Sequence, residues 1–167
     1  QSNLFLRRTN MVVIEMDNGG IIRIEVDEKA APITAANFLK LVKEGFYDGL
    51  TFHRVISGFM VQGGDPTGTG AGGSKDTIKG EFASNGYNNP LKHTRGVISM
   101  ARTMDPNSAS SQFFIMHADA PHLDGQYAAF GKVVEGMGVI DQIAASRTDF
   151  RDKPVTPVVM KRVYIEN

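Results

Sequence analysis

Between Thr51 and Val134 the sequence consists of short apolar segments separated by long loops rich in glycine, asparagine and serine. The apolar segments are short and rich in β-branched and aromatic residues, which favours strands over helices. The expected strands are 51–56, 59–63, 96–102, 112–117 and 127–134. Many strands and few helices predict a closed antiparallel β-barrel with helices packed at its ends, although the pattern alone also permits an α+β sandwich.

Two alternating segments near the N-terminus predict a β-hairpin. In each of the segments 11–16 and 21–26, three apolar residues recur at every second position, as expected for a strand with a buried face. Asn18 and Gly19 lie between the two segments, and both residue types tolerate the positive φ angles of a tight primed turn. The chain is therefore expected to reverse at Asn18-Gly19.

Two further segments have helical periodicity. Residues 31–47 place apolar side chains at i, i+3, i+4 and i+7, with Pro32 in the first turn, and so predict an amphipathic helix. Residues 135–146 are expected to form a second, shorter helix. The C-terminal segment 155–167 is expected to be a closing strand, in which Pro157 marks an edge or a bulge.

The charge balance and the cysteine count exclude several classes of function. Eighteen basic and eighteen acidic residues give a net charge of zero, so no attraction to nucleic acid or to an anionic membrane is expected. The chain has no cysteine, which excludes disulfides, thiol nucleophiles and thiolate metal sites and fits a reducing compartment. We therefore expect a cytoplasmic monomer, and a targeting segment upstream of this sequence would change that expectation.

The length of 167 residues fits one domain with a sizeable core. The first three residues, QSN, resemble the remnant of a cleavable tag, so residues 1–10 are interpreted as a tag remnant and an N-terminal extension. Residues 11–167 are interpreted as the folded domain. No apolar run approaches the roughly 20 residues of a membrane-spanning helix, so no membrane partner is expected.

Three other kinds of site have weak support in the sequence. The loop GTGAGG, residues 68–73, matches a dinucleotide-binding pattern, but no helical segment follows it, so its glycines are interpreted as turn residues. No G-x-S-x-G nucleophile elbow is present, which disfavours a serine hydrolase. A metal hydrolase is a distant alternative, because the histidines lack helical spacing and an acidic cluster. The histidines are His53, His93, His117 and His122.

Strands in the middle of the chain are apolar on both faces. In QFFIM, residues 112–116, Phe113 and Ile115 point to one side, while Phe114 and Met116 point to the other. A barrel fills its interior with only one of these faces. The second apolar face must therefore be covered by another part of the chain or must bind a ligand.

An arginine stands within one of these apolar segments. In 51–56, Phe52, Arg54 and Ile56 are expected to share a face. Arginine cannot shed its charge, so its presence here needs a reason. The residues alone leave two interpretations open. Either the outer face is covered and Arg54 forms a structural ion pair, or the face is a binding surface and the guanidinium acts on what is bound.

Four motifs occur together in an order and at intervals typical of one family. They are FHRVISGFMVQGGD, GVISMAR, SQFFI and LDGQYAAFGKVVEGM. From Met11 to Glu166 the sequence resembles the cyclophilins, which are peptidyl-prolyl cis–trans isomerases, and the stretch MARTMDPNSASSQFF most resembles a bacterial single-domain member. The resemblance implies an eight-stranded antiparallel β-barrel capped by two α-helices, with the active site on the outer face of the barrel.

The resemblance also implies an activity and a catalytic set. It implies rotation about X-Pro bonds of peptides and unfolded proteins, which assists folding and requires no metal, cofactor or covalent intermediate. Arg54 matches the catalytic arginine, which would donate hydrogen bonds to the prolyl nitrogen as the amide twists. Gln62 matches the residue that orients this arginine, and His53 matches a supporting histidine that lines the site. A non-catalytic module that binds proline peptides on the same fold is the alternative.

The remaining site residues are assigned by the same resemblance. Phe59, Met60, Phe114 and Leu123 match the walls of the proline pocket. Ala101 and Arg102 match the segment whose backbone holds the residue before proline, Gln112 would form the floor, and Thr103 and Ser111 would border the neighbouring groove.

Three positions depart from the usual family pattern. His122 stands where many eukaryotic members carry a tryptophan that is important for cyclosporin binding, so weakened affinity for cyclosporin is expected. Arg102 replaces the usual asparagine, so catalysis should survive while peptide preference changes. Tyr127 replaces a histidine at the far wall of the pocket and retains a ring there.

Overall fold

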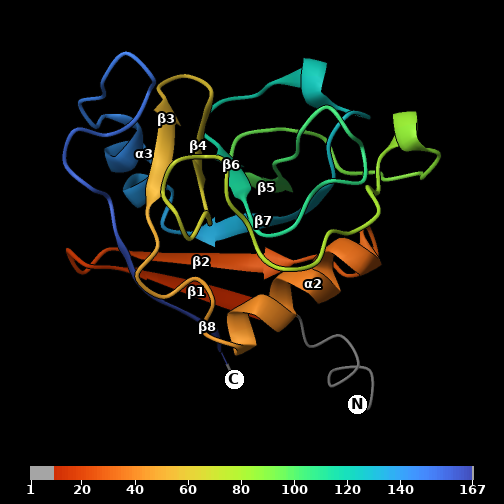
Figure 1. Cartoon of the computed structure of the whole chain (residues 1–167), viewed down its shortest axis with the longest axis horizontal. Coiled ribbons are helices and arrows are strands. Elements are labelled where there is room, and N and C mark those ends of the chain that lie inside the picture. The colour runs from red at the N-terminus through yellow and green to blue at the C-terminus, as the bar shows by residue number, and fades with distance from the viewer. Residues whose placement is uncertain (1–9, 167) are drawn as a thin grey trace.

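The structure is a computed structural model that describes residues 10–166 (Figure 1). Within these residues the chain forms a sheet of eight strands, two α-helices and two short 3₁₀ helices. The strands are β1 (Asn10–Met16), β2 (Ile21–Val26), β3 (Phe52–Ile56), β4 (Met60–Gly63), β5 (Val97–Met100), β6 (Phe113–Met116), β7 (Ala129–Glu135) and β8 (Met160–Glu166). The helices are α2 (Pro32–Lys43), α3 (Met137–Ala144), η1 (Ala83–Asn85) and η2 (Pro121–Leu123). The mainly-β prediction is confirmed, and no helix in this part of the chain has the length and hydropathy needed to cross a bilayer.

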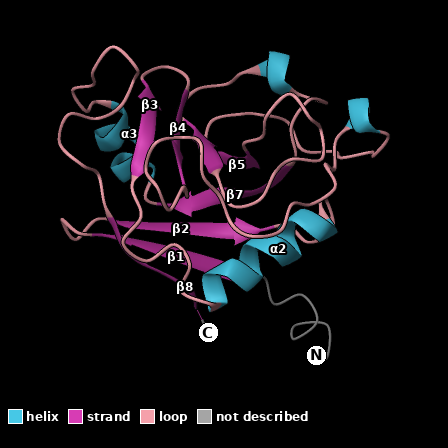
Figure 2. Ribbon diagram, in the orientation of Figure 1, coloured by secondary structure: helices cyan, strands magenta, loops and turns pink. Residues whose placement is uncertain are grey.

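The strands follow the order β3-β4-β6-β5-β7-β2-β1-β8, and every neighbouring pair is antiparallel. The sheet curls, so that β3 and β4 run across the direction of β1, β2 and β8 in Figure 2. Its two end strands meet through an isolated bridge between Thr51 and Val159, and the amide of Phe52 donates to the carbonyl of Val158 at 3.0 Å. The barrel therefore closes at a short contact and not along a full ladder.

The two helices complete the interior of the barrel. Phe38 of α2 is fully buried, and its ring lies 5.6 Å from Phe113 of β6 and 5.0 Å from Phe130 of β7, measured between ring centroids. From α3, Ile140 and Ile143 join the same core. Apolar side chains at helical spacing thus cover the open ends of the barrel, as the sequence predicts.

The bounds of the outer elements differ slightly from the prediction. The helices occupy 32–43 and 137–144, within the predicted segments 31–47 and 135–146. The last strand begins at Met160, so Pro157 precedes β8 and does not interrupt it. Proline cannot donate to a strand ladder, which explains why pairing starts after it. Residues 1–9, which belong to the segment interpreted as a tag remnant and extension, lie outside the described residues, as does residue 167.

The first hairpin has a different turn from the predicted one. Gly19 has a φ angle of 91°, but Asn18 does not have a positive φ, so the two-residue primed turn is wrong. Gly19 N–H donates to Met16 O at 2.9 Å, and Met16 N–H donates to Gly20 O at 2.8 Å. This is a three-residue turn that ends in a left-handed glycine. The side chain of Asn18 stabilises the turn by accepting a hydrogen bond from Gly20 N–H at 2.9 Å.

Candidate active site

The outer face of the sheet carries its own apolar cluster. On β6, Phe113 and Ile115 belong to the barrel interior, whereas Phe114 and Met116 belong to the outer cluster, as the alternation predicts. The buried members of the outer cluster are Met60, Val97, Phe114, Met116, Ala120, Leu123 and Ala129. Residues 10–166 do not cover this face completely, because part of it opens as a pocket.

The pocket has a volume of about 130 Å³. It is lined by Arg54, Phe59, Met60, Gln62, Ala101, Arg102, Phe114, Leu123 and Tyr127. Most of these positions were assigned to substrate binding by resemblance, and the fold brings them together from β3, β4, β6, η2 and three connecting segments. The pocket is apolar on its buried side, where Met60, Phe114 and Leu123 are each less than 10% exposed, and polar at its rim. It suits a small apolar ring held beside a cation.

A bulge in β3 places Arg54 at this rim. Phe52 pairs with Gly63 and Arg54 pairs with Gln62, so two residues of β3 advance where β4 advances one. Phe52 therefore faces the interior and does not share a face with Arg54, which corrects the prediction. Arg54 is exposed, and it forms no ion pair with a carboxylate of residues 10–166. The structural ion pair is thus not found in this part of the chain.

His53 is the extra residue of the bulge. Its side chain is buried, with 6% of the residue exposed, and it does not line the pocket. Neither ring nitrogen has a hydrogen-bond partner among the described residues. Burial disfavours the charged imidazolium and lowers the pKa of His53. The sequence predicts a histidine lining the site, and the structure places it beneath the glycine loop, against Gly70.

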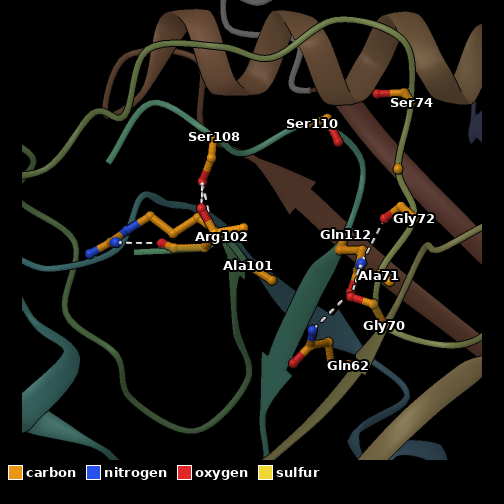
Figure 3. A pocket seen from close by; sticks show the side chains of 12 residues that line it. Gln62, Gly70, Ala71, Gly72, Ser74, Ala101, Arg102, Ser108, Ser110 and Gln112 are labelled. Carbon is orange, nitrogen blue, oxygen red and sulfur yellow. Dashed lines mark hydrogen bonds between the residues drawn. The ribbon is translucent and has the colours of Figure 1, made fainter. Parts of the chain in front are cut away.

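Arg54 is oriented by a run of amide groups. Figure 3 shows the part of this run that connects Gln62 and Gln112 to the glycine loop. Its Nη1 donates to Gln62 Oε1 at 3.2 Å, and Gln62 Nε2 donates to Gln112 Oε1 at 2.9 Å. Gln112 Nε2 then donates to the carbonyls of Gly70 and Gly72 at 3.0 and 2.7 Å. Because each glutamine uses its nitrogen as a donor and its oxygen as an acceptor, the run fixes which end of Gln62 faces the guanidinium.

The glycine loop at the end of this run is anchored by Asp65, which sequence reasoning missed. This carboxylate is 1% exposed and accepts hydrogen bonds from Thr67 N and Oγ1, both at 2.8 Å, and from the amides of Gly70 and Gly72 at 2.6 and 3.0 Å. Burial alone would raise the pKa of Asp65, but these donors outweigh it and lower the pKa to about 2. The motif GGD followed by threonine and glycines was the available signal.

A second cavity of about 230 Å³ continues from the pocket. The two share Gln62, Ala101 and Arg102, and the second is also lined by Gly70, Ala71, Gly72, Gly73, Ser74, Thr103, Ser108, Ser110 and Gln112. Gln112 was expected at the floor of the proline pocket, and it lines the second cavity instead. Thr103 borders this groove as expected, but Ser111 does not. Its hydroxyl is fully buried and donates to Gly64 O at 2.7 Å, whereas Ser110 lines the groove. The prediction for Ser111 is off by one residue, because successive side chains point to opposite sides.

Arg102 and Tyr127, two of the positions that depart from the usual family pattern, contact each other. The guanidinium of Arg102 lies 4.7 Å from the ring centroid of Tyr127 and 4.8 Å from that of Phe82. Its Nε and Nη2 donate to Gln126 O at 3.2 and 2.6 Å, and its Nη1 donates to Thr103 O at 2.9 Å. Arg102 is therefore held in place at the border of both cavities.

A hydrogen-bonded triad lies behind the pocket. His93 Nδ1 lies 3.0 Å from Asp124 Oδ1, and its Nε2 lies 2.9 Å from Ser99 Oγ. The order resembles a hydrolytic triad, but Ser99 and His93 are buried, and the His93 ring stacks on Phe114 at 6.0 Å. Burial lowers the pKa of His93. The triad supports the pocket wall from behind, and its members are too far apart in the sequence for spacing to reveal it.

The other histidines do not form a metal site. His122 is exposed on η2 and stacks on Phe59 with 6.0 Å between ring centroids and an interplanar angle of 26°. Across residues 10–166 no group of three or more histidine, aspartate or glutamate side chains is placed to hold a metal ion. The metal-hydrolase alternative therefore has no site in this part of the chain.

Known sequences agree with this architecture. Residues 11–165 match the family model described as cyclophilin type peptidyl-prolyl cis-trans isomerase/CLD. The chain is 48% identical to the peptidyl-prolyl cis-trans isomerase ppi1 of Schizosaccharomyces pombe, over 87% of this chain and 94% of that protein. It is 51% identical to a peptidyl-prolyl cis-trans isomerase of Helicobacter pylori, over 75% of this chain and 76% of that protein.

Solved structures agree as well. A cyclophilin type peptidyl-prolyl cis-trans isomerase of Cryptosporidium parvum superposes with a TM-score of 0.88 at 33% identity, covering 96% of this chain and 99% of that one. The same protein crystallised in the presence of the dipeptide Ala-Pro gives a TM-score of 0.86 at 34% identity, covering 94% and 99%. With a matched family model across nearly all of its length and close relatives of the same kind, the chain belongs to the cyclophilin-type peptidyl-prolyl cis–trans isomerase family.

Proposed function

We propose that this chain accelerates rotation about X-Pro bonds in peptides and unfolded proteins by donating hydrogen bonds from Arg54 to the twisted amide. One observation carries the proposal. A guanidinium with no carboxylate partner among the described residues stands at the rim of an apolar pocket of about 130 Å³. A proline ring would enter the pocket, and its amide would then lie beside the cation.

The chemistry needs only a positioned donor. An X-Pro amide rotates over a barrier of about 18–20 kcal/mol, because the nitrogen lone pair is delocalised into the carbonyl. Twisting the bond localises that lone pair, so the nitrogen becomes a hydrogen-bond acceptor. A donor aimed at the nitrogen stabilises the twisted state more than either planar state, which lowers the barrier. No proton is transferred and no bond to the enzyme forms.

Arg54 suits this role because it is oriented before the substrate arrives. The amide run from Gly70 and Gly72 through Gln112 and Gln62 holds one of its nitrogens, and its other N–H groups have no acceptor among residues 10–166. A preorganised donor of this kind is worth about 2.7–4 kcal/mol, or roughly a hundred- to a thousandfold in rate. The crystals of the Cryptosporidium relative with Ala-Pro support binding of proline peptides by this fold.

The test is isomerisation of a short Ala-Pro-Phe-type peptide, measured by exchange NMR, which reports both binding and turnover. Wild type should exchange the peptide rapidly, and Arg54→Ala should lose roughly a hundredfold or more of the rate while still binding. Arg54→Lys, which keeps the charge but not the planar fork, should recover little. Arg162→Ala is the matched control, because Arg162 lies on β8 and stacks on Tyr164 at 4.1 Å.

The alternative is a module that binds proline peptides without turning them over. Wild type that binds the peptide but leaves its exchange rate unchanged would establish this alternative and would overturn catalysis by Arg54.

A further inference from the structure

One wall of the pocket is held through its backbone. Phe59 follows the turn between β3 and β4, and its amide donates to Ile56 O at 3.0 Å. Its carbonyl accepts hydrogen bonds from the amides of His117 and Ala118 at 2.9 and 3.4 Å. The position of the Phe59 ring therefore depends on the segment that follows β6 and on the turn residue Gly58, which precedes it.

The side chain of His117 connects this turn to α3. Gly58 N–H donates to His117 Nδ1 at 2.8 Å, and His117 Nε2 lies 3.1 Å from Asp141 Oδ1. Asp141 belongs to α3, which packs beside β3 and β4 (Figure 1). Arg95 donates hydrogen bonds to both carboxylate oxygens of Asp141 at 2.8 Å and also donates to His117 O at 2.9 Å.

These contacts fix the tautomer of His117. A backbone N–H can only donate, so Nδ1 must be the unprotonated nitrogen when it faces Gly58. The proton of the neutral ring then lies on Nε2 and is donated to Asp141. The hydrogen bonds from Arg95 lower the pKa of Asp141 and keep it an anionic acceptor. The ring is thus an acceptor toward the turn and a donor toward the helix, in one defined orientation.

We propose that His117 is a positioning residue that sets the Phe59 wall of the proline pocket by accepting the hydrogen bond of Gly58. The proposal rests on the proposed function for its meaning, since the wall matters because a proline ring packs against it. His117 itself does not line the pocket. Loss of the Gly58 bond should loosen the turn, move Phe59 and weaken peptide binding, while the transition-state donor Arg54 is left in place.

Two substitutions separate the two nitrogens. In His117→Asn the amide lies at the level of Nδ1, so its oxygen can still accept from Gly58, but it cannot reach Asp141. In His117→Gln the amide lies at the level of Nε2, so it can still donate to Asp141, but Gly58 N–H loses its acceptor. The two variants thus differ in which hydrogen bond they keep, and comparable unfolding midpoints would show that neither result reflects loss of the fold.

The experiment measures three quantities for the full chain with the Ala-Pro-Phe-type peptide: the Kd, the KM and kcat, and the scalar coupling across the hydrogen bond between Gly58 nitrogen and His117 Nδ1. Wild type should show the coupling. His117→Gln should raise Kd and KM by about tenfold with little change in kcat, because a contact made equally in ground and transition states is lost. His117→Asn should remain within about twofold of wild type.

Equal behaviour of the two variants, or absence of the coupling in wild type, would overturn the proposal. Because Kd is measured by titration, its outcome does not depend on turnover. A wild type that binds without catalysing would remove the proposed function and would leave the role of His117 in shaping the pocket to be decided by Kd and the coupling.

Discussion

Replacing Asp65 with asparagine tests whether a buried carboxylate holds the floor of the site. The carboxylate accepts four hydrogen bonds from Thr67, Gly70 and Gly72, and its pKa falls from 3.8 to about 2. Each pKa unit is worth about 1.36 kcal/mol, so the charged form contributes on the order of 2 kcal/mol of folding free energy at pH 7. Asp65→Asn should lose this contribution, together with a further amount because its amide nitrogen cannot accept from the loop.

The sign of the pH dependence follows from the lowered pKa. The stabilisation is complete above the ordinary pKa of 3.8 and is lost as the pH falls toward 2, because the native carboxylate must then be protonated. At pH 3, which lies between the two pKa values, roughly half of this contribution should remain. The difference in unfolding free energy between wild type and Asp65→Asn should therefore shrink by about 1 kcal/mol between pH 7 and pH 3.

Urea unfolding followed by circular dichroism measures this difference, since the chain has no tryptophan for fluorescence. The exposed Asp76→Asn is the matched control and should leave the unfolding curve unchanged. We also expect kcat/KM to fall, because the carbonyls of Gly70 and Gly72 accept the hydrogen bonds of Gln112, which belongs to the run that orients Arg54. A difference of the same size at pH 7 and pH 3 would refute the reasoning, since it would show that the charge of Asp65 does not contribute to stability.

Three further predictions concern other residues of the site. Burial lowers the pKa of His53 and of His93, so below about pH 6.5 the unfolded chain binds protons that the folded chain does not. The free energy of unfolding should therefore fall below that pH, by up to about 1.4 kcal/mol per pH unit for each histidine. Equal urea midpoints at about pH 7.5 and pH 5.5 would contradict this. Cyclosporin should bind weakly, because His122 places only a small ring beside Phe59. His122→Trp should tighten binding in a direct titration. Tight binding by wild type would refute this prediction. The Arg102 guanidinium forms no ion pair within residues 10–166, so its charge is available to attract a glutamate near proline. Arg102→Asn should therefore keep turnover but lower the affinity for glutamate-containing peptides relative to their alanine counterparts. An unchanged ratio of the two affinities would count against this.

The fold could be predicted because it follows from local patterns. Alternation on 112–116 assigns Phe113 to the core and Phe114 to the outer face, and the structure confirms both. Helical spacing likewise identifies the segment of Phe38 as a helix that covers the barrel. In each of these cases the residues that determine the outcome are neighbours in the sequence, so periodicity is enough.

The errors arose where the period is interrupted or where the contacts are distant. Strict alternation assigns Phe52 and Arg54 to one face, but a bulge at His53 adds a residue and turns Phe52 inward. The turn at Asn18 is governed by loop length, which composition does not determine. Asp65 was missed although its partners are close in the sequence, because an irregular loop has no period from which their convergence on one carboxylate could be predicted. His117 was missed because its partners come from the turn at Gly58 and from α3, which only the folded chain brings together.

The closure of the sheet also bears on aggregation. A free strand edge is a template for pairing with any extended chain. On β3, Phe52 donates to the segment before β8 and Val55 N–H donates to Asp152 O at 2.7 Å. On β8, Met160 N–H donates to Leu50 O at 2.8 Å and Val163 N–H donates to the side chain of Asp48 at 2.8 Å. A protein proposed to bind unfolded chains thus binds them through side chains in a groove, from which a client can dissociate. The backbone groups named above at the strand edges are already hydrogen-bonded, so they cannot template cross-β assembly with the same clients.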